Sequence, residues 1–318
     1  MKKIVILDGY ASNPGDLSWD ELAQLGELTV YERTAPEQLA ARIADAQVIF
    51  TNKVPLDAAA LRAAPRLELI CMLATGYNIV DVEAARRRGI PVCNIVGYST
   101  GAVAQMTFAL LLELTQHVGQ YDALVHSGEW TDSPDFCCLR APLTELAGKT
   151  MGLIGYGAIG QAVGAVALAF GMRLLVTARH ERPVPHGARF VTLDELLAQS
   201  DVVSLHCPLT PESAGMIDAA ALKKMKPGAL LLNTARGALV DEQAVADALH
   251  AGTLGAYGAD AVTVEPIPHG HPLLTAPRCI LTPHIAWAPK ETRIRLHRLA
   301  AENLRAFLAG SPIHVVEP

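Results

Sequence analysis

Residues 148–160 read Gly-Lys-Thr-Met-Gly-Leu-Ile-Gly-Tyr-Gly-Ala-Ile-Gly. The apolar run Met151–Ile154 leads directly into the motif Gly155-x-Gly157-x-x-Gly160, and a helical pattern over Gln161–Phe170 follows at once. A strand, a tight glycine turn and a helix N-terminus in this order form the context in which such a motif binds a dinucleotide. The sequence therefore predicts a nucleotide-binding α/β unit that begins in mid-chain.

The three glycines of this motif have separate predicted tasks. Gly155 permits the turn, Gly157 lets a pyrophosphate approach the backbone, and Gly160 lets the helix and the strand pack closely. The free N–H groups of the first helical turn and the positive end of its dipole would hold the phosphates, which adds Ala158 and Ile159 to the predicted cofactor contacts. The alternative is a glycine-rich turn that binds nothing, and the strand–turn–helix context argues against it.

Length and composition exclude several protein classes. A chain of 318 residues with 51% hydrophobic residues can fill the cores of two domains. The formal net charge of −6 gives no general basic surface, so we expect no nucleic-acid partner. The six cysteines follow no paired C-x-x-C spacing and are interpreted mainly as buried reduced thiols, while the vicinal pair Cys137–Cys138 in a predicted loop is given no chemistry.

Neither the N-terminus nor the longest apolar stretch of the chain indicates an export signal or a membrane span. The N-terminal Met-Lys-Lys-Ile-Val-Ile-Leu-Asp begins a strand and lacks the apolar core and cleavage site of a signal peptide. The apolar stretch Ala162–Ala178 contains Arg173 and is better divided into a helix and the next strand. A soluble, cytoplasmic protein is expected.

The first third of the chain alternates between strand-like and helix-like runs. The expected strands are Lys3–Leu7, Leu28–Glu32, Val48–Thr51, Leu67–Leu73 and Pro91–Asn94, and the expected helices lie near Ser18–Leu25, Pro36–Ala44, Asp57–Ala63 and Asp81–Arg88. This alternation predicts a parallel sheet with helices on both faces. The segment has no G-x-G-x-x-G motif of its own.

A second alternating series runs from Thr150 to Pro283, after a long helix predicted over Ser99–His117 whose broad apolar surface indicates burial or a subunit contact. Its expected strands are Thr150–Ile154, Arg173–Thr177, Val202–His206, Ala229–Asn233, Gly255–Ala259 and Cys279–Leu281. They predict a six-stranded, doubly wound Rossmann domain. Because the last predicted helix, Lys290–Leu308, has no strand left to pair with there, we expect it to return to the first domain. The dinucleotide-binding domain (99–287) is thus inserted in a smaller, flavodoxin-like α/β substrate domain (1–98 and 288–318).

Three charged or titratable side chains follow strand-like runs of this second series. Arg236 follows Leu-Leu-Asn-Thr-Ala, Glu265 follows Gly-Ala-Asp-Ala-Val-Thr-Val, and His284 follows Ile-Leu-Thr-Pro. Ligands of open α/β sheets bind beyond the carboxyl ends of the strands. A guanidinium can hold a carboxylate and polarise a carbonyl, a histidine can deliver a proton to an oxygen, and a carboxylate beside that histidine favours its protonated form and orients its ring.

Each of the three also has a structural interpretation when it is taken singly. Arg236 could belong to a surface ion pair, Glu265 could be a loop carboxylate before Pro266, and His284 could be a hydrogen-bonded loop histidine. Their joint placement after three strands of a nucleotide domain favours chemistry instead. The set suits hydride transfer between a nicotinamide and a 2-oxo acid.

Four ordered motifs resemble the signatures of the D-isomer-specific 2-hydroxyacid dehydrogenases, and the likeness extends over nearly the whole chain. The segment 142–150 and Trp287 look most like the glycerate dehydrogenase/hydroxypyruvate (glyoxylate) reductase branch. The motifs are Pro142-Leu-Thr-Glu-Leu-Ala-Gly-Lys-Thr, Asn-Thr-Ala-Arg236-Gly-Ala-Leu-Val-Asp, Gly-Ala-Asp260-Ala-Val-Thr-Val-Glu265-Pro and Thr-Pro-His284-Ile-Ala-Trp287.

The resemblance assigns roles to residues of this sequence. It implies that Arg236 anchors the substrate carboxylate, that His284 is the acid/base and that Glu265 orients it. It further implies a dimer with its cleft between two domains. The remaining implied contacts are Asp260, Thr234, His206, Cys207 and Pro208 for the cofactor, and Ala74, Thr75, Gly76 and Trp287 for the substrate.

One position departs from the usual pattern of enzymes that use NAD. Such an enzyme carries Asp or Glu at the end of its second strand to bind the ribose 2′-OH, whereas this strand ends in Ala178 followed by Arg179, with Arg182 nearby. A missing carboxylate removes repulsion toward a 2′-phosphate, which a guanidinium can bind. We therefore predict NADP as the preferred cofactor, with NAD as the second choice. In the alternative, Arg179 stacks on the adenine or points to solvent, and Glu181 serves NAD.

The expected activity is the reduction of hydroxypyruvate or glyoxylate to the D-2-hydroxy acid, reversible toward D-glycerate or glycolate. Oxidation of another 2-hydroxy acid or of phosphite, and a dinucleotide-sensing protein like the dehydrogenase-shaped corepressors, are the alternatives, because fold alone does not decide function. Formate dehydrogenases of this superfamily have Gln where this chain has Glu265. No metal is expected: His269 and His271 lack a third ligand and are interpreted as parts of a proline-rich surface loop.

Overall fold

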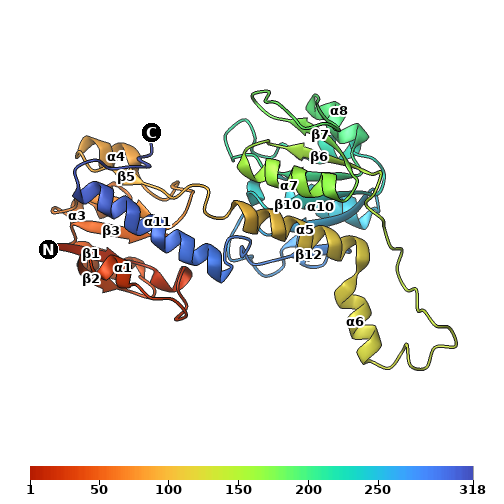
Figure 1. The fold of residues 1–318 in the computed structure, drawn as a ribbon, viewed down its shortest axis with the longest axis horizontal. Helices are drawn as coiled ribbons and strands as arrows, with labels where there is room; N and C mark the ends of the chain where they lie inside the picture. Colours follow the sequence, from red (N-terminus) through yellow and green to blue (C-terminus); the bar gives the residue numbers. More distant parts are fainter. Residues whose placement is uncertain (318) are drawn as a thin grey trace. The chain divides into compact units, whose positions relative to one another are not determined.

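A computed structural model describes residues 1–317, which fold into two compact units (Figure 1). Met1–Ser99 and residues 287–317 form the first unit, and Thr100–Ala286 forms the second. The sequence places the boundaries at 98/99 and 287/288, and the units of the structure meet at 99/100 and 286/287. Each unit contains one sheet, and the strand pairs described within both sheets are parallel.

The first unit contains a five-stranded sheet in the order β2-β1-β3-β4-β5. This is the flavodoxin-like order, as the sequence predicts. The apolar runs form strands because both faces of the sheet are covered, so that β3 and β4 are buried along their whole length. The strands are β1 (Lys2–Ile6), β2 (Gly26–Val30), β3 (Val48–Thr51), β4 (Leu69–Met72) and β5 (Val92–Cys93).

Helices cover both faces of this first sheet. Asp57 and Asp81 cap the N-termini of two of them, because each carboxylate accepts a hydrogen bond from the backbone N–H three residues later. The helices are α1 (Asp20–Ala23), α2 (Pro36–Ile43), α3 (Ala58–Ala63), α4 (Val82–Arg87) and, from the C-terminus, α11 (Lys290–Leu308), with a short 3-10 helix η1 (Gly9–Ala11).

Helix α11 returns to the first unit, as predicted, and packs against β4. Leu296 and Leu304 are fully buried in the core on that side. A polar cluster joins the same helix to the loop after β1. Arg293 donates to both carboxylate oxygens of Asp16 (2.6 and 2.8 Å), and the ring of His297 stacks on Trp19 at a centroid distance of 4.2 Å.

The second unit contains a seven-stranded sheet in the order β12-β11-β10-β9-β6-β7-β8. The prediction of six strands is wrong by the short edge strand β8, Ala188–Phe190, which pairs with β7 from Leu174↔Ala188 onward. Three residues of mixed polarity after a proline-containing loop carry no strand pattern, so only the pairing with β7 defines them. The other strands are β6 (Thr150–Ile154), β7 (Arg173–Thr177), β9 (Val202–Leu205), β10 (Ala229–Asn233), β11 (Leu254–Ala259) and β12 (Cys279–Leu281).

Two groups of helices cover the two faces of the second sheet, which makes it doubly wound. On one face α5 (Thr100–Gln116) and α7 (Ala158–Ala169) share a core with β6 and β7. On the other face the core includes α8 (Leu193–Gln199), α9 (Ala219–Lys224) and α10 (Glu242–His250). Short 3-10 helices, η2 (Gly237–Leu239) and η3 (Pro272–Leu274), follow β10 and precede β12.

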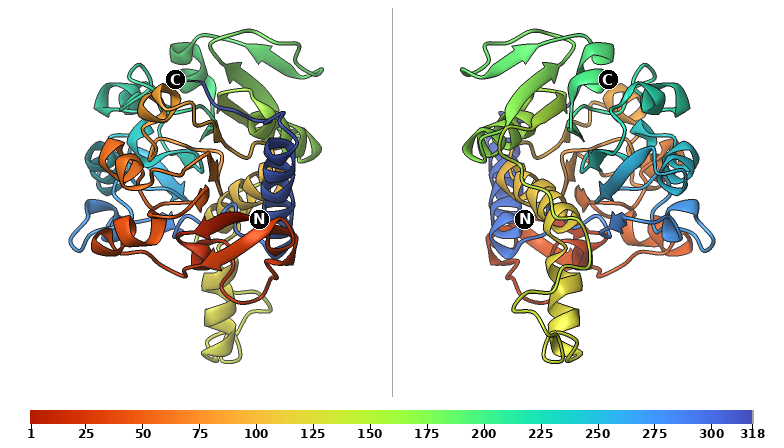
Figure 2. Two further views of the ribbon diagram at one scale, coloured as in Figure 1. Left: turned by 90° about the vertical axis from the view of Figure 1, so that its left-hand side faces the viewer. Right: turned by 90° about the vertical axis from the view of Figure 1, so that its right-hand side faces the viewer.

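An arm formed by α6 (Val118–His126) and the loop 127–145 projects from the second unit (Figures 1 and 2). Large apolar side chains on the arm are exposed, with Phe136 91% and Leu139 74% accessible. Cys137 is exposed on the same loop, and Cys71 and Cys93 are buried in β4 and β5 as free thiols. Over residues 1–317 no helix has both the length and the apolar character that are needed to cross a membrane.

We predict that His297 makes the stability of the chain depend on pH. Burial lowers the pKa of His297 to about 4, from an ordinary value of 6.5. As the pH falls, His297 takes up a proton in the unfolded state before it does so in the folded state. The contribution of the neutral His297 to the free energy of unfolding is therefore complete above about pH 6.5. It is lost between about pH 6.5 and 4, by up to about 3 kcal/mol.

The matched variant is His297→Phe, which keeps a ring on Trp19 and cannot titrate. Urea unfolding followed by tryptophan fluorescence gives the free energy of unfolding of both proteins. The value for the wild type, relative to that for the variant, should fall as the pH is lowered from 7 to 4. Equal differences between the two proteins at pH 7 and pH 4 would contradict the assignment.

Candidate active site

The glycine turn between β6 and α7 has the geometry that its sequence predicts. Gly155 has a positive φ of 98°, and a Cβ on it would overlap the carbonyl of His206. A Cβ on Gly160 would overlap the carbonyl of Gly155, so the helix and the turn pack backbone to backbone. Gly157 differs, because no atom of the described chain lies within 4 Å of a Cβ built there.

This open space lies at the N-cap of α7, where the first backbone N–H groups of a helix have no partner within the helix. Residues 157–159 therefore present donors and a positive dipole end to the space in front of Gly157. An anionic pyrophosphate fits this combination of open space and N–H groups. The turn can hold a dinucleotide by its phosphates.

His206 lies at the end of β9, directly beneath the turn. Its Nε2 is 2.8 Å from the hydroxyl of Ser204, and burial lowers the pKa of the imidazole to about 4, so the ring is neutral at pH 7. Burial also raises the pKa of the neighbouring Cys207 thiol. In the structure, the backbone of His206 packs against Gly155. The contact of residues 206–208 with the adenine stays a prediction.

The end of β7 presents two exposed guanidinium groups and no carboxylate at its last position. Ala178 is half-buried, whereas Arg179 and Arg182 are exposed. The hydroxyl of Thr210 and, more weakly, the charge of Arg179 lower the pKa of Glu212, which places Glu212 near this guanidinium. Arg179 is thus available to an anion, with Glu212 as a competing neighbour.

His284 and Glu265 form a hydrogen-bonded pair beyond the ends of β12 and β11. Nδ1 of His284 lies 2.7 Å from Oε2 and 2.9 Å from Oε1 of Glu265, and the backbone N–H of Val262 also donates to Oε1 (3.3 Å). The two side chains are 30% and 31% accessible. Because Nδ1 faces the carboxylate, Nε2 is the nitrogen available for proton exchange with a ligand.

The backbone of His284 is in the left-handed region, with φ 55°, and Asp260 holds the segment that follows. The buried carboxylate of Asp260 accepts hydrogen bonds from the backbone N–H groups of Ile285 (2.9 Å) and Ala286 (2.7 Å), and from the hydroxyl of Thr282 (2.5 Å). The resemblance implies that Asp260 lies near the nicotinamide. In the structure its carboxylate accepts hydrogen bonds from within the chain and fixes the loop that carries His284.

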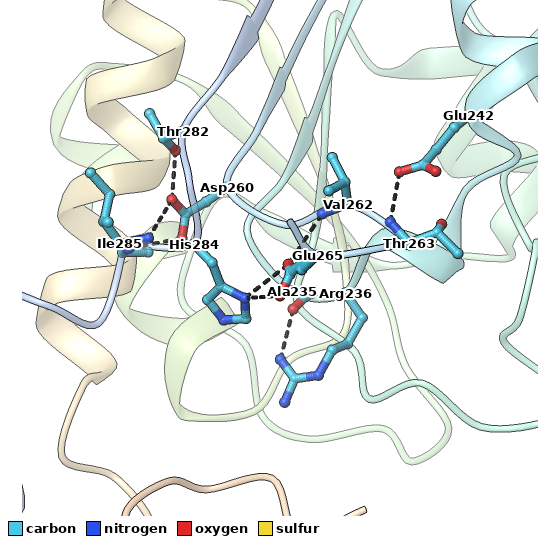
Figure 3. Close-up of polar contacts among 11 residues, drawn as sticks. Ala235, Arg236, Glu242, Asp260, Val262, Thr263, Glu265, Thr282, His284 and Ile285 are labelled. Atoms are coloured by element: carbon cyan, nitrogen blue, oxygen red, sulfur yellow. Dashed lines mark hydrogen bonds and ion pairs between the residues drawn. The ribbon is translucent and has the colours of Figure 1, made fainter. Parts of the chain in front are cut away.

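Arg236 lies at the end of β10, beside Glu265 and His284 (Figure 3). Its side chain is exposed, and Nη1 donates to the carbonyl of Ala235 (2.7 Å). The amide of Asn233 in turn donates to the carbonyl of Arg236 (2.8 Å). Thr234 hydrogen-bonds Thr107 of α5 through their hydroxyl groups (2.9 Å). The structure thus brings the three predicted catalytic side chains together at one edge of the sheet.

In the first unit the predicted substrate loop follows β4. The hydroxyl of Thr75 donates to the carbonyl of Ile95 (2.7 Å), which fixes the loop. Within residues 1–317, no group accepts a hydrogen bond from the backbone N–H of Thr75 or Gly76, so both remain available to an anion. Trp287, by contrast, packs partly buried against the core of this unit.

Two buried carboxyl groups near these strand ends escaped sequence reasoning. Asp8 collects the backbone N–H groups of Asn52, Lys53 and Val54 and thereby shapes the loop after β3, although burial raises its pKa. Glu242 pairs with His271 (3.2 Å). Neither stands in a motif, and only the fold shows their partners.

The proline-rich segment is exposed at residues 268–270, as predicted for a surface loop, but His271 departs from this interpretation. Its side chain is only 10% accessible, because Nε2 faces Glu242 and Nδ1 accepts from the backbone N–H of Leu273. Within the part of the chain that the structure describes, no group of three or more His, Cys, Asp or Glu side chains is placed to hold a metal ion.

Comparison with known proteins identifies the family. The family model for the NAD-binding domain of the D-isomer specific 2-hydroxyacid dehydrogenases matches residues 108–286. The chain belongs to this family. It is 50% identical over 319 residues to a hydroxypyruvate reductase of Blautia hydrogenotrophica and 41% identical over 319 residues to a glycerate dehydrogenase of Methylorubrum extorquens, with 99% of each chain covered in both comparisons.

Solved structures agree with this assignment. An acyclic imino acid reductase in complex with NADPH and D-Arg has a TM-score of 0.86 and 30% identity, with coverage of 99% of this chain and 100% of that one. As a D-isomer specific 2-hydroxyacid dehydrogenase, the chain is an oxidoreductase that uses a nicotinamide dinucleotide. The predictions of family, fold class and enzyme class are confirmed.

We predict that Gly157→Ala separates dinucleotide binding from stability. The added methyl group enters open space at a φ of −76°, so the melting temperature should stay the same or rise. Because the methyl group occupies the approach path of the pyrophosphate, the Kd of NADPH should rise at least about tenfold.

Fluorescence titration with NADPH and thermal melting check this prediction. Gly101→Ala, which adds a methyl group to open space in α5, is the control: its melting temperature should likewise stay the same or rise, and the Kd of NADPH should not change. Unchanged NADPH affinity in Gly157→Ala would show that the phosphates bind elsewhere.

Proposed function

We propose that the chain reduces a small 2-oxo acid, hydroxypyruvate or glyoxylate, to the corresponding D-2-hydroxy acid. The observation that carries this proposal is the pair formed by Nδ1 of His284 and the carboxylate of Glu265, which leaves Nε2 as a proton donor beside Arg236. Relatives named hydroxypyruvate reductase, glycerate dehydrogenase and glyoxylate reductase support the choice of substrate.

Each residue of the set has a chemical task in this proposal. The guanidinium of Arg236 binds the substrate carboxylate and polarises the 2-oxo group. In the first unit, the free N–H groups of Thr75 and Gly76 are proposed as donors to an anion. The bound nicotinamide supplies the hydride for the carbonyl carbon. His284 gives the proton on Nε2 to the carbonyl oxygen, and Glu265 stabilises the charged imidazole through Nδ1 before the transfer.

We predict that His284→Ala lowers kcat for hydroxypyruvate by about 10²–10⁴, because the general acid is lost. NADPH oxidation followed at 340 nm with hydroxypyruvate and glyoxylate measures the effect. The Kd of NADPH, measured separately, should stay near the wild-type value. Near-normal turnover in the variant would exclude His284 as the proton donor, and no turnover by the wild type would refute the proposed substrates.

We also propose that NADP is preferred over NAD. The support is the half-buried Ala178 in place of a carboxylate, and the exposed guanidinium of Arg179 directly after it. The negative charge of Glu212 would repel a 2′-phosphate, whereas the positive charge of Arg179 would attract it. The preference for NADP over NAD therefore depends on both side chains. NAD stays the second cofactor.

We predict that Arg179→Ala shifts the ratio of kcat/KM for NADPH over NADH toward NADH by about ten- to a hundredfold. This corresponds to a lost charged hydrogen bond of roughly 1.5–3 kcal/mol. Steady-state kinetics with both cofactors measures the ratio. Arg189→Ala, an exposed arginine on β8, is the control and should leave it unchanged. An unaltered ratio in Arg179→Ala would refute the role of this residue.

A homodimer is the proposed assembly. The arm formed by α6 and the loop 127–145 supports it, because a projecting segment with exposed Phe136 and Leu139 is suited to cover a second subunit. The cytoplasmic location stays a prediction from the sequence.

A further inference from the structure

A short backbone segment, residues 262–263, connects the candidate active site to a buried hydrogen-bonded pair outside it, Glu242 and His271. The segment follows β11 and Asp260, and one residue, Val264, separates it from Glu265. Its N–H groups are directed to two carboxylates: Val262 donates to Glu265 itself, and Thr263 donates to Oε1 of Glu242 at 2.9 Å (Figure 3).

On one side the segment lies against Gly237, the residue after Arg236. A Cβ on Gly237 would overlap the carbonyl carbon of Val262 and the amide nitrogen of Thr263. The backbone that leads to Glu265 is therefore in direct contact with the backbone that carries Arg236. Any displacement of 262–263 changes the spacing between these two side chains.

On the other side the segment is held by Glu242, the first residue of α10. The Glu242 side chain is 8% accessible, and its second oxygen, Oε2, lies 3.2 Å from Nε2 of His271. Because Nδ1 of His271 accepts a hydrogen bond from the N–H of Leu273, the proton of the ring is on Nε2 and points to Glu242. Each polar atom of this buried pair thus has a defined partner, and one of these partners is Thr263.

We propose that the Glu242–His271 pair is a positioning element for the reaction. His271 orients the carboxylate of Glu242, Glu242 fixes the N–H of Thr263, and the fixed segment sets Glu265 on Nδ1 of His284 at the correct distance from Arg236. Neither Glu242 nor His271 touches the reacting atoms in this arrangement. The inference rests on the proposed function only for its kinetic consequence, since the placement of Glu265 on His284 is measurable without turnover.

Loss of the bond to Thr263 has a definite consequence for His284. The ring is held by Glu265 through Nδ1, and Arg236 lies beside it (Figure 3). When Glu265 moves away from Nδ1, the imidazole loses the hydrogen bond that fixes its tautomer and its orientation. The NMR signal of Nδ1 then changes.

Three substitutions at Glu242 separate the positioning role from charge and from helix stability. Glu242→Ala and Glu242→Asp both break the contact with Thr263, and the aspartate keeps the negative charge at the start of α10. Glu242→Gln keeps an acceptor oxygen at full length for Thr263, but its NH₂ group then faces the Nε2–H of His271, so an intermediate effect is expected. Asp241→Ala is the matched control, because it removes the N-cap of the same helix without touching Thr263.

The test combines NMR with kinetics. In protein labelled with ¹⁵N-histidine, the Nδ1 and Nε2 signals of His284, assigned with His284→Asn, are recorded at one pH in each variant. We expect the Nδ1 signal to leave its wild-type position in Glu242→Ala and Glu242→Asp, and to keep it in Asp241→Ala. With hydroxypyruvate as substrate, kcat should fall about 10- to 100-fold in the first two variants, less than about 5-fold in Asp241→Ala and by an intermediate factor in Glu242→Gln, while the Kd of NADPH is unchanged.

An Nδ1 signal of His284 at the wild-type position in both Glu242→Ala and Glu242→Asp would overturn the proposal, as would losses of kcat that follow the melting temperature across all four variants. If Glu242→Ala does not fold, Glu242→Asp decides the question. A wild type that turns over no 2-oxo acid refutes the proposed function alone, because the Nδ1 signal of His284 still decides the positioning role.

Discussion

The backbone of Val262 and Thr263 lies directly against Gly237, and the arrangement of the candidate active site depends on this close approach. Only a residue without a Cβ allows it. The contact joins the end of β10, which carries Arg236, to the end of β11, which leads to Glu265. Asp260 then ties the loop after β12 to the same edge through the N–H groups of Ile285 and Ala286. The three side chains proposed to be catalytic come from three strand ends, and these backbone contacts connect those strand ends to one another.

Buried carboxylates that accept hydrogen bonds from backbone N–H groups recur near strand ends in both units. Asp8 does so for the loop after β3, Asp260 for the loop after β12, and Glu242 for the segment before Glu265. A buried carboxylate is costly unless it is fully hydrogen-bonded, so each of them holds its loop in one conformation. The flexible parts of an α/β unit are its loops, and this is how the chain makes loop residues rigid enough for chemistry.

Much of the fold could be predicted because its signals are local. β6, β10 and β12 have the predicted bounds, since each is an apolar run that ends at a turn. The glycine motif and the strand ends at Arg236, Glu265 and His284 are equally visible in the sequence. By contrast, β8 exists only because β7 offers a free edge to three residues of mixed polarity.

The pairing of Glu242 with His271 spans 29 residues, and the task of Gly237 appears only when 262–263 pack against it. The side chains proposed for the chemistry were therefore visible in the sequence, whereas the packing of Gly237 and the partners of Glu242 and His271 were not.

A crystal structure of the chain with NADP and oxalate, a stable analogue of glyoxylate, shows whether Arg236 and His284 have the proposed roles. One carboxylate of oxalate should lie on the guanidinium of Arg236, with an oxygen of the other within hydrogen-bond distance of Nε2 of His284, while Nδ1 stays on Glu265. Oxalate bound without either contact, or a His284 ring turned so that Nε2 faces Glu265, would contradict these roles.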